Sequence, residues 1–251
     1  MGWRIFTRHH RFLASRRPPA AISFTRGEKA IREPRRTALG LLYELFGDAA
    51  FTLSALPALR AFSPVEQANV QVMLKRHLNT PVTSSVGRLF DAIAAILGLR
   101  LRSSFEAQAA MDLEFVLDGL DTDEAYPLPL VQGDPAGAPC TLDWAAMVQT
   151  IIEEMQQQVA PGLIAAKFHN ALAEAIVAVA AWVGEERVLL TGGCFQNRYL
   201  TERAIQRLKK AHFSPYWHQR IPPNDGGIAL GQIVAAARAP FSGHEDVGKP
   251  A

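Results

Sequence analysis

Two glycine-containing stretches near the end of the chain carry the residue types of a ligand-binding loop. The first, Gly192-Gly193, joins the apolar run VLL to a helical pattern that starts at Asn197. Because glycine has no Cβ, backbone amides in such a turn can approach a ligand, and the positive end of a helix dipole favours an anion such as phosphate. The stretch has neither the GxxxxGK[ST] pattern of a Walker loop nor the GxGxxG pattern of a dinucleotide site. A tight turn without a ligand is therefore an equal alternative.

The second stretch, PPNDGG, places Asp225 before another glycine pair and follows the next predicted strand. Loops at the carboxyl ends of neighbouring parallel strands face one crevice, so we expect Asp225 to point toward whatever Gly192-Gly193 binds. An anion and a carboxylate at one site would need a cation between them. Asn-Asp-Gly-Gly is also common turn chemistry, and the alternative is that Asp225 only caps the last helix.

Two acidic residues upstream bear on the same site. Asp91 lies in the helical stretch SSVGRLFDAIAAILGL among small residues, so a group such as a ribose hydroxyl pair could approach its carboxylate. A solvated helix face is the alternative. Glu106 follows Ser103 at the spacing of a capping box, and the spacing alone favours that structural role. His169, inside another helical stretch, is interpreted as a satisfied helix histidine and receives no chemical role.

Helices and two strands must position these residues. Apolar spacing predicts helices over 35–47, 63–78, 84–99, 144–158 and 163–183, with Ser63 as an N-cap and Gly47 as a C-cap. Residues 121–139, rich in Pro, Gly and Asp, are the clearest loop. From residue 187 the pattern becomes strand (188–190), helix (197–210), strand (214–219) and helix (226–238). This order predicts a parallel α/β layer.

Composition places the chain among globular proteins. Its 251 residues, 49% of them hydrophobic, can bury a sizeable core in one or two domains. Cys140 and Cys194 are far apart and form no CxxC pair, which excludes a disulfide framework and a cysteine-based zinc site within one chain. This usage fits a reducing cytoplasm, where we expect the protein. No apolar run reaches the roughly 18 residues of a membrane helix, so no membrane span is expected.

The beginning of the chain differs in charge from the rest. Residues 1–36 hold ten Lys and Arg against two Glu, a local charge of +8 that leaves −6 for the remainder. A transit peptide or a nucleic-acid-binding arm would have this composition. We favour a third interpretation, in which residues 1–21 lie outside the fold and nucleic acid is not a partner.

Several long motifs occur together and in a fixed order: REP followed by RRTALGLL, then TSSVGRLFDAIAAILGL, FEAQAAMDLE, FHNALA, LTGGCFQNRYLTE and PPNDGGIALGQ. From about Ile22 to about Pro240 they resemble the C-terminal part of the HypF family, the carbamoyltransferases of [NiFe] hydrogenase maturation. The resemblance implies an α/β fold, a partial actin/Hsp70/sugar-kinase-like domain with a ribonuclease-H-like lobe and a large helical insert. It predicts a helical insert over 22–186, a C-terminal α/β lobe over 187–240 and a flexible tail over 241–251.

The same resemblance implies an activity. The family makes carbamoyl adenylate from carbamoyl phosphate and ATP, and passes the carbamoyl group to the C-terminal cysteine of its partner HypE, where dehydration yields the thiocyanate that supplies cyanide to iron. Nucleotide contacts are then expected at five positions and a ligand of a divalent metal (zinc, iron or magnesium) at a sixth; no catalytic residue is assigned. The nucleotide positions are Asp91, Glu106, Gly192, Gly193 and Asn197, and the metal position is Asp225.

The chain departs from the family pattern in two respects. Ala107 stands where the family usually has glycine, so its methyl group is expected to crowd the nucleoside or the turn. The upstream domains and the first lobe of the family have no counterpart here, and His9-His10 is not the HHxAH-type motif of the histidine metal ligands. We therefore expect a chain that is inactive alone, exposes a partly apolar inter-lobe surface and is complemented by an upstream HypF fragment. The alternative is a non-catalytic nucleotide- or HypE-binding module.

Overall fold

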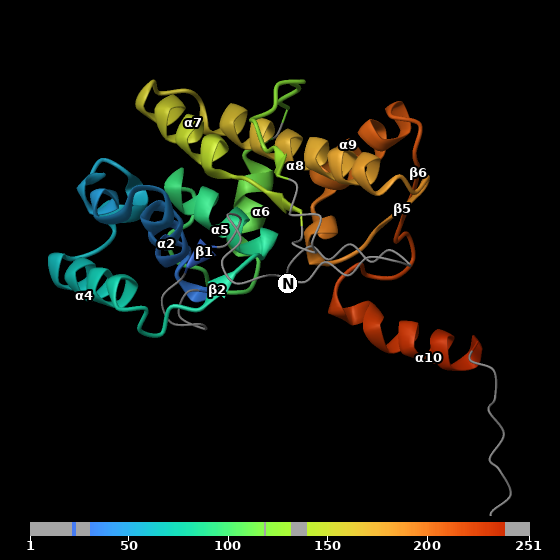
Figure 1. Cartoon of the computed structure of the whole chain (residues 1–251), viewed down its shortest axis with the longest axis horizontal. Coiled ribbons are helices and arrows are strands. Elements are labelled where there is room, and N and C mark those ends of the chain that lie inside the picture. Colours follow the sequence, from blue (N-terminus) through green and yellow to red (C-terminus); the bar gives the residue numbers. More distant parts are fainter. Residues whose placement is uncertain (1–21, 24–30, 118, 132–139, 239–251) are drawn as a thin grey trace, which may run out of the picture.

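The computed structural model of the chain describes residues 22–23, 31–117, 119–131 and 140–238 (Figure 1). The predicted basic segment 1–21 and the predicted tail 241–251 lie outside the described residues. Most of the elements up to residue 183 are helices, and the order from residue 187 is strand, helix, strand, helix. The α/β fold class is therefore confirmed, while the predicted division into domains stays a prediction.

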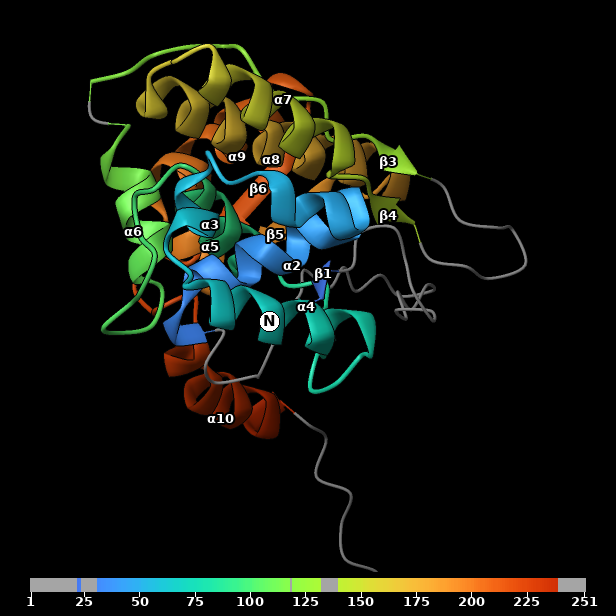
Figure 2. The same ribbon diagram turned by 90° about the vertical axis from the view of Figure 1, so that its left-hand side faces the viewer.

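The helices of the first part enclose most of the buried apolar residues. They are α2 (Pro34–Phe46), α3 (Pro57–Arg60), α4 (Pro64–Lys75), α5 (Val86–Ile96), α6 (Gln108–Phe115), α7 (Ala145–Gln156) and α8 (Pro161–Val183), with the 3-10 turn η1 (Gly47–Thr52) after α2. Figure 2 shows α2 and α5 beneath the α7–α8 layer. The predicted helices agree with these bounds to within a few residues, as is usual at helix ends.

The α5 helix is the centre of this core. All residues from Leu89 to Ile96 are buried, and α2 packs along the helix. Phe90 meets Phe168 of α8 edge to face, with 5.0 Å between the ring centroids. A helix buried on every side needs small residues as well as large ones, which explains the alanines that alternate with the predicted apolar stripe.

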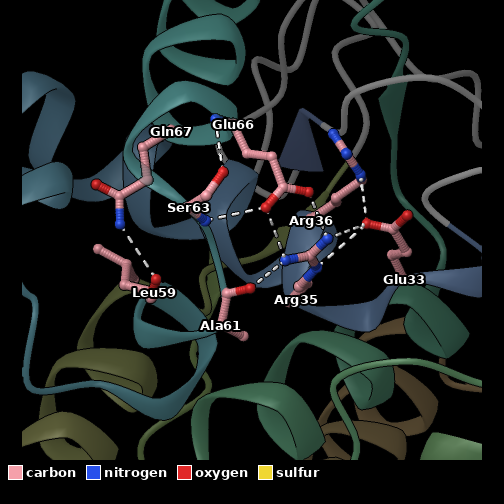
Figure 3. Close-up of polar contacts among 8 residues, drawn as sticks. All are labelled: Glu33, Arg35, Arg36, Leu59, Ala61, Ser63, Glu66 and Gln67. Carbon is pink, nitrogen blue, oxygen red and sulfur yellow. Dashed lines mark hydrogen bonds and ion pairs between the residues drawn. The ribbon is translucent and has the colours of Figure 1, made fainter.

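Local sequence signals mark the start of α4 and the end of α2, as predicted. Ser63 caps α4: its hydroxyl accepts a hydrogen bond from the Glu66 amide, and the Glu66 carboxylate accepts one from the Ser63 amide at 2.9 Å (Figure 3). This reciprocal capping box occupies amides that lack a partner within the helix. Gly47 ends α2 at φ +56°, a left-handed conformation that glycine adopts without strain.

A buried guanidinium ties the start of α2 to the α3–α4 turn. The Arg35 residue is only 1% exposed, and its Nη2 lies 2.8 Å from Glu33 Oε2 and 2.9 Å from Glu66 Oε1 (Figure 3). It also donates to the Ala61 carbonyl and lies over the Phe62 ring, 4.2 Å from the ring centroid. Although burial by itself raises the pKa of Glu33, hydrogen bonds from Arg35 and its neighbouring arginine hold that pKa below the ordinary value. The REPRR motif is therefore a structural clamp in this part of the fold.

Two short antiparallel strand pairs were not predicted. β1 (Ile22–Ser23) pairs with β2 (Val82–Thr83), and β3 (Leu130–Val131) pairs with β4 (Thr141–Leu142). The second pair begins inside the predicted loop 121–139, of which residues 132–139 lie outside the described part. A strand of two residues is too short to show the alternation of apolar and polar residues from which strands are predicted.

The α8 helix is long and apolar enough to cross a membrane by length and composition alone. The prediction concerned an uninterrupted apolar run, and Lys167 and Glu174 do interrupt this helix, so α8 reaches the length only when two charges are allowed within it. However, 72% of its most apolar 18-residue window is buried inside the protein, which is typical of a core helix. α8 packs mainly against α9, and α7, α6 and β3 are further neighbours.

The last part of the described chain contains a parallel strand pair. Its elements are β5 (Arg187–Leu190), the 3-10 turn η2 (Gly193–Gln196), α9 (Arg198–Lys210), β6 (Ser214–Trp217), the 3-10 turn η3 (Asp225–Gly227) and α10 (Ile228–Arg238). β5 and β6 lie parallel, with Leu189 opposite Tyr216 and Leu190 opposite Trp217. The α9 helix connects them and packs between α8 and β6, which gives the predicted parallel layer.

Candidate functional site

The carboxyl ends of β5 and β6 bring the two glycine-containing loops together. The Gly192 amide donates a hydrogen bond to the Pro223 carbonyl at 2.7 Å, which joins the GG turn to the PPNDGG loop. Directly before these loops, Thr191 Oγ1 lies 2.9 Å from His218 Nε2. The predicted meeting of the loops is therefore present, and it occurs at the edge where open parallel sheets commonly bind ligands.

The glycine pair leaves room on one side of the turn. Gly192 has φ +111°, a value that L side chains rarely adopt. Apart from the adjacent residues in the chain, no heavy atom of the described residues lies within 4 Å of a Cβ built at Gly192 or Gly193. The turn does not lead directly into the helix as expected, because η2 intervenes. Close backbone approach of a ligand is possible at this turn, but the start of α9 lies one short turn further on.

The first amides of α9 already have partners within the chain. Glu114 of α6 accepts hydrogen bonds from the amides of Arg198 at 2.7 Å and Tyr199 at 3.3 Å. A carboxylate at this position compensates the positive end of the helix dipole. The predicted phosphate would therefore have to bind ahead of α9, at the glycine turn, rather than at the helix terminus itself.

Asn197 is buried and acts as the N-cap of α9. Its Oδ1 accepts a hydrogen bond from the Leu200 amide at 2.8 Å, and its Nδ2 lies 2.9 Å from Nε2 of His169. His169 Nδ1 lies 2.7 Å from the Ala165 carbonyl, so this nitrogen carries the proton and Nε2 accepts from Asn197. Burial lowers the pKa of His169 to about 4, which keeps the ring neutral. The interpretation of His169 as a satisfied helix histidine is confirmed.

The neighbouring residues of the FHNALA motif have similar structural roles. Asn170 donates to the carbonyls of Thr122 at 2.7 Å and Glu124 at 2.8 Å, and it accepts from the Tyr199 hydroxyl at 3.1 Å. The rings of His169 and Tyr199 meet edge to face at 5.5 Å. These contacts hold α8 against α9 and thereby fix the position of the glycine turn.

Asp91 is enclosed rather than exposed. The residue is 3% exposed, so the alternative of a solvated helix face was wrong, because α5 is covered on all sides. Its Oδ2 lies 2.6 Å from Arg88 Nη1, yet the pair lacks hydrogen-bond geometry and neither atom has another hydrogen-bond partner among the described residues. Burial raises the pKa of Asp91 to about 7, with Arg88 opposing the shift and Glu106 adding to it.

Glu106 is exposed, and its charge adds to the raised pKa of Asp91. The capping box expected from Ser103 and Glu106 was wrong. α6 starts at Gln108, its N-cap residue is Ala107, and the side chain of Gln108 accepts from the Ser104 amide at 2.8 Å. Glu106 is thus left free of the structural role that its spacing favoured.

Ala107 occupies a conformation that suits glycine. Its φ of +63° lies in the left-handed region, which costs a residue with a Cβ about 1–2 kcal/mol. Of the two effects expected of its methyl group, strain in the turn before α6 is therefore present in the structure.

Asp225 is exposed at the first position of η3. Asn224, rather than Asp225, caps η3, because the Asn224 side chain accepts from the Gly226 amide at 3.0 Å. No hydrogen bond within the described residues supports the alternative that Asp225 caps the last helix. The Asp225 carboxylate makes no hydrogen bond or ion pair with a described residue, which leaves it available. Within residues 31–117, 119–131 and 140–238, no group of three His, Cys, Asp or Glu side chains could hold a metal ion. Because protein metal sites usually need about three such ligands, these residues do not fit a metal by themselves.

Sequence reasoning missed three polar residues of this region, namely Arg88, Thr191 and His218. Thr191 and His218 lie at the carboxyl ends of predicted strands, so the rule that pointed to the glycine loops also points to them. Arg88 precedes Asp91 by three residues, a spacing at which helical side chains meet.

Comparison with known proteins identifies the family. Residues 18–232 match the family described as "Carbamoyltransferase, Kae1-like Domain, second subdomain". Carbamoyltransferase HypF of Synechocystis sp. is 40% identical over an alignment of 224 residues, gaps included, which covers 84% of this chain and 28% of that protein. Carbamoyltransferase HypF of Rhodobacter capsulatus is 38% identical over an alignment of 216 residues, which also covers 84% of this chain and covers 26% of the relative.

Solved structures agree with this relationship. Full-length HypF in the phosphate- and nucleotide-bound form superposes with a TM-score of 0.76 at 33% identity, covering 86% of this chain and 33% of that one. HypF of T. kodakarensis gives a TM-score of 0.72 at 26% identity, covering 86% of this chain and 29% of that one. The chain thus spans a third or less of the length of these relatives. It belongs to the HypF carbamoyltransferase family and corresponds to a C-terminal part of its members.

Proposed function

We propose that this chain is the C-terminal portion of a carbamoyltransferase that transfers a carbamoyl group from carbamoyl adenylate to the C-terminal cysteine of HypE, for cyanide-ligand synthesis in [NiFe] hydrogenase maturation. Membership of the family supports the reaction class. The observation that carries the proposal is the contact between the Gly192 amide and the Pro223 carbonyl, which places both motif loops at the carboxyl ends of β5 and β6. The proposal includes a cytoplasmic location.

The nucleotide part of the site divides into an open and a closed portion. Gly192 and Gly193 present backbone with free space beside it, and Glu106 is exposed at the start of α6. We assign these residues to direct contact with ATP or carbamoyl adenylate. Asp91 contributes to the ribose side only after its contact with Arg88 rearranges, because its carboxylate is buried. Asn197 does not contact the ligand in this proposal. It stabilises the glycine turn by capping α9 and by its hydrogen bond to His169.

Asp225 supplies one ligand of a divalent metal (zinc, iron or magnesium) in this proposal. When bound, such a metal would polarise phosphate or carbamoyl oxygens. Because the described residues do not complete a metal site, the other ligands come from an upstream HypF fragment that complements the chain. The chain alone is then inactive, with carbamoyl phosphate as a substrate only of the completed protein.

The test is carbamoyl transfer to HypE, followed by mass spectrometry of the partner's terminal cysteine. The purified chain, supplied with carbamoyl adenylate, metal and HypE, should give no transfer, whereas co-expression with the upstream part of Synechocystis HypF should restore it. In the restored protein, Asp225→Asn should abolish transfer, while Gln219→Asn, a change at an exposed residue before the same loop, should leave it nearly unchanged. Turnover by the chain alone, or full activity of Asp225→Asn, would refute the assignment.

A second candidate is a non-catalytic module that binds nucleotide or HypE. The lack of a complete metal site among the described residues favours it. Calorimetric titration of the chain with ATP separates the two. Nucleotide binding without any transfer in the complemented protein supports the module, and transfer supports the enzyme part.

A further inference from the structure

The β5–β6 pair has one covered face and one open face. The side chains that pack toward the core are Val188, Leu190 and Trp217. On the other face, Leu189 is 64% exposed and Tyr216, directly opposite it in the register, is 54% exposed. Side chains alternate between the two faces of a strand, so the residues that follow the last paired positions belong to the open face. These residues are Thr191, after β5, and His218, after β6.

Thr191 and His218 form a hydroxyl–imidazole pair at the carboxyl ends of the two strands. Thr191 Oγ1 lies 2.9 Å from His218 Nε2. Thr191 is exposed and His218 is half-buried, so a ligand can reach both side chains. Thr191 directly precedes the glycine turn, whose Gly192 amide donates to the Pro223 carbonyl. The pair therefore lies beside the point at which the two motif loops meet.

This contact determines which nitrogen of the His218 ring is free. When the Thr191 hydroxyl accepts the Nε2 proton, the lone pair of the neutral ring is on Nδ1. No described residue forms a hydrogen bond with His218 Nδ1. His169, by contrast, has both ring nitrogens in contact with partners in the core. An imidazole that is oriented through one nitrogen and open at the other has the arrangement of a general base.

We propose that His218 is the general base of the transfer reaction and that Thr191 is its positioning residue. The proposal rests on the proposed function and deepens it by assigning a residue that takes part in the chemistry. A thiol reacts as its thiolate, so carbamoyl transfer to the HypE cysteine needs a proton acceptor. Asp225, the carboxylate in the neighbouring loop, is assigned to the metal, whereas Nδ1 of His218 is not engaged.

In the proposed step, His218 Nδ1 accepts the proton of the cysteine S–H as the sulfur attacks the carbonyl carbon of carbamoyl adenylate. The S–C bond forms, the bond between that carbon and the phosphate oxygen breaks, and AMP leaves with the electron pair of the broken bond. The imidazolium then releases its proton to water, and no atom is oxidised or reduced. Thr191 keeps its contact throughout, because its oxygen accepts from Nε2–H in both charge states of the ring.

The experiment uses the chain co-expressed with the upstream part of Synechocystis HypF and follows transfer to HypE over time by mass spectrometry. His218→Gly should lower kcat by about 100-fold or more and change KM for carbamoyl adenylate by less than about threefold, because the base acts in the transition state. Added imidazole should restore part of the rate, since it can occupy the vacated place. His218→Gln, which keeps most of the bulk of the ring, should show the same loss without a response to imidazole.

Two comparisons separate the chemical role from a structural one. His212→Gly, at an exposed histidine before the amino end of β6, is the matched control and should change neither the rate nor its response to imidazole. Thr191→Val, which keeps the shape of the side chain but not its hydroxyl, should lower kcat by about tenfold, as expected for the loss of one hydrogen bond. Thr191→Ser, which keeps the hydroxyl, should retain most of the activity.

Circular dichroism of each variant checks that the chain still folds. An unchanged kcat in His218→Gly, a loss that imidazole does not restore, or equal losses in Thr191→Val and Thr191→Ser would each overturn the proposal. If the parent protein transfers the carbamoyl group, any of these results counts against the roles of His218 and Thr191 alone. Absence of transfer in the parent protein refutes the proposed function and this proposal with it.

Discussion

The part of the chain before residue 184 and the part after residue 187 differ in how completely they cover their own apolar surface. In the helical part, α5 is buried on all sides and even the guanidinium of Arg35 is enclosed by its partners. In the α/β part, one face of the strand pair and the whole of α10 are exposed. The two regions are joined by the contacts of α8 with α9, which the Asn197–His169 bond reinforces.

Because of this difference, we expect the helical part to carry most of the stability and the α/β part to carry the binding site. The helical part contains most of the buried apolar residues of the described chain. The α/β part keeps its two motif loops together, while one face of its strand pair and α10 stay exposed in the described part of the chain. The helical part is therefore the element against which stability changes are best measured, and the α/β part is the element in which substitutions change binding with little effect on stability.

The largest difference in stability between the two regions is expected when a charged side chain is replaced, because that side chain is buried in one region and exposed in the other. Arg35→Met should lower the free energy of unfolding by about 3–5 kcal/mol, because it leaves the carboxylate of Glu33 buried with one partner fewer. Arg198→Met is the matched change in α9, where the exposed arginine pairs with Glu202 at 2.7 Å, and should cost far less, because an exposed ion pair contributes little to stability. Urea denaturation measures both values. Equal costs would mean that the helical part does not carry the stability of the chain.

The raised pKa of Asp91 allows a second test, which asks through the pH dependence of stability whether this carboxyl group is buried. Its folded pKa of about 7 lies above the 3.8 of a free aspartate, so the folded state holds the proton more tightly. This stabilisation is fully present below about pH 4 and is lost as the pH rises through 7, by roughly 4 kcal/mol in total. Asp91→Asn removes the titration, so its stability relative to the parent chain should grow between pH 4 and pH 8.

Thermal unfolding of the parent and Asp91→Asn chains at several pH values checks this expectation. Asp123→Asn, at an exposed residue that pairs with Arg203, serves as the control and should show no such increase. A constant difference between the parent and Asp91→Asn across the range would mean that the carboxylate is not closed off from solvent.

The smallest expected effect concerns the turn that carries Glu106. Ala107→Gly should stabilise the chain by about 1 kcal/mol, because the left-handed conformation no longer strains a Cβ. Ala110→Gly inside α6 should have the opposite sign and a similar size, since glycine is unfavourable within a helix. Chemical denaturation of the two variants measures the contrast, and a loss of stability with Ala107→Gly would show that the turn relaxes without strain.

Local signals in the sequence predicted much of the fold. Ser63 and Glu66 revealed the start of α4, Gly47 revealed the end of α2, and the strand–helix order after residue 187 revealed the parallel pair. These features depend on residues close in the chain. The meeting of the two glycine loops was also predictable, because parallel strands fix which loop ends share an edge.

Features that depend on distant residues were not predictable. The residues around Asp91 in its own helix are compatible with an exposed or a buried position. Asp91 is buried because α2 packs along α5. Glu114 caps a helix that starts more than 80 residues later, a relation that no local spacing encodes. Glu106 matched a capping box, but the left-handed Ala107 delays the helix beyond it. The roles of the candidate residues toward nucleotide and metal stay predictions.

The α8 helix has a consequence for the synthesis of the chain on the ribosome. The surface that α9 covers in the folded protein is formed by residues made before α9 itself. At about 5–20 residues per second, translation of residues 184–210 takes roughly 1–5 s, and during this interval a helix of membrane-spanning length and composition lacks its cover. The order of synthesis thus exposes to the targeting machinery and chaperones of the cell a segment that the finished protein hides.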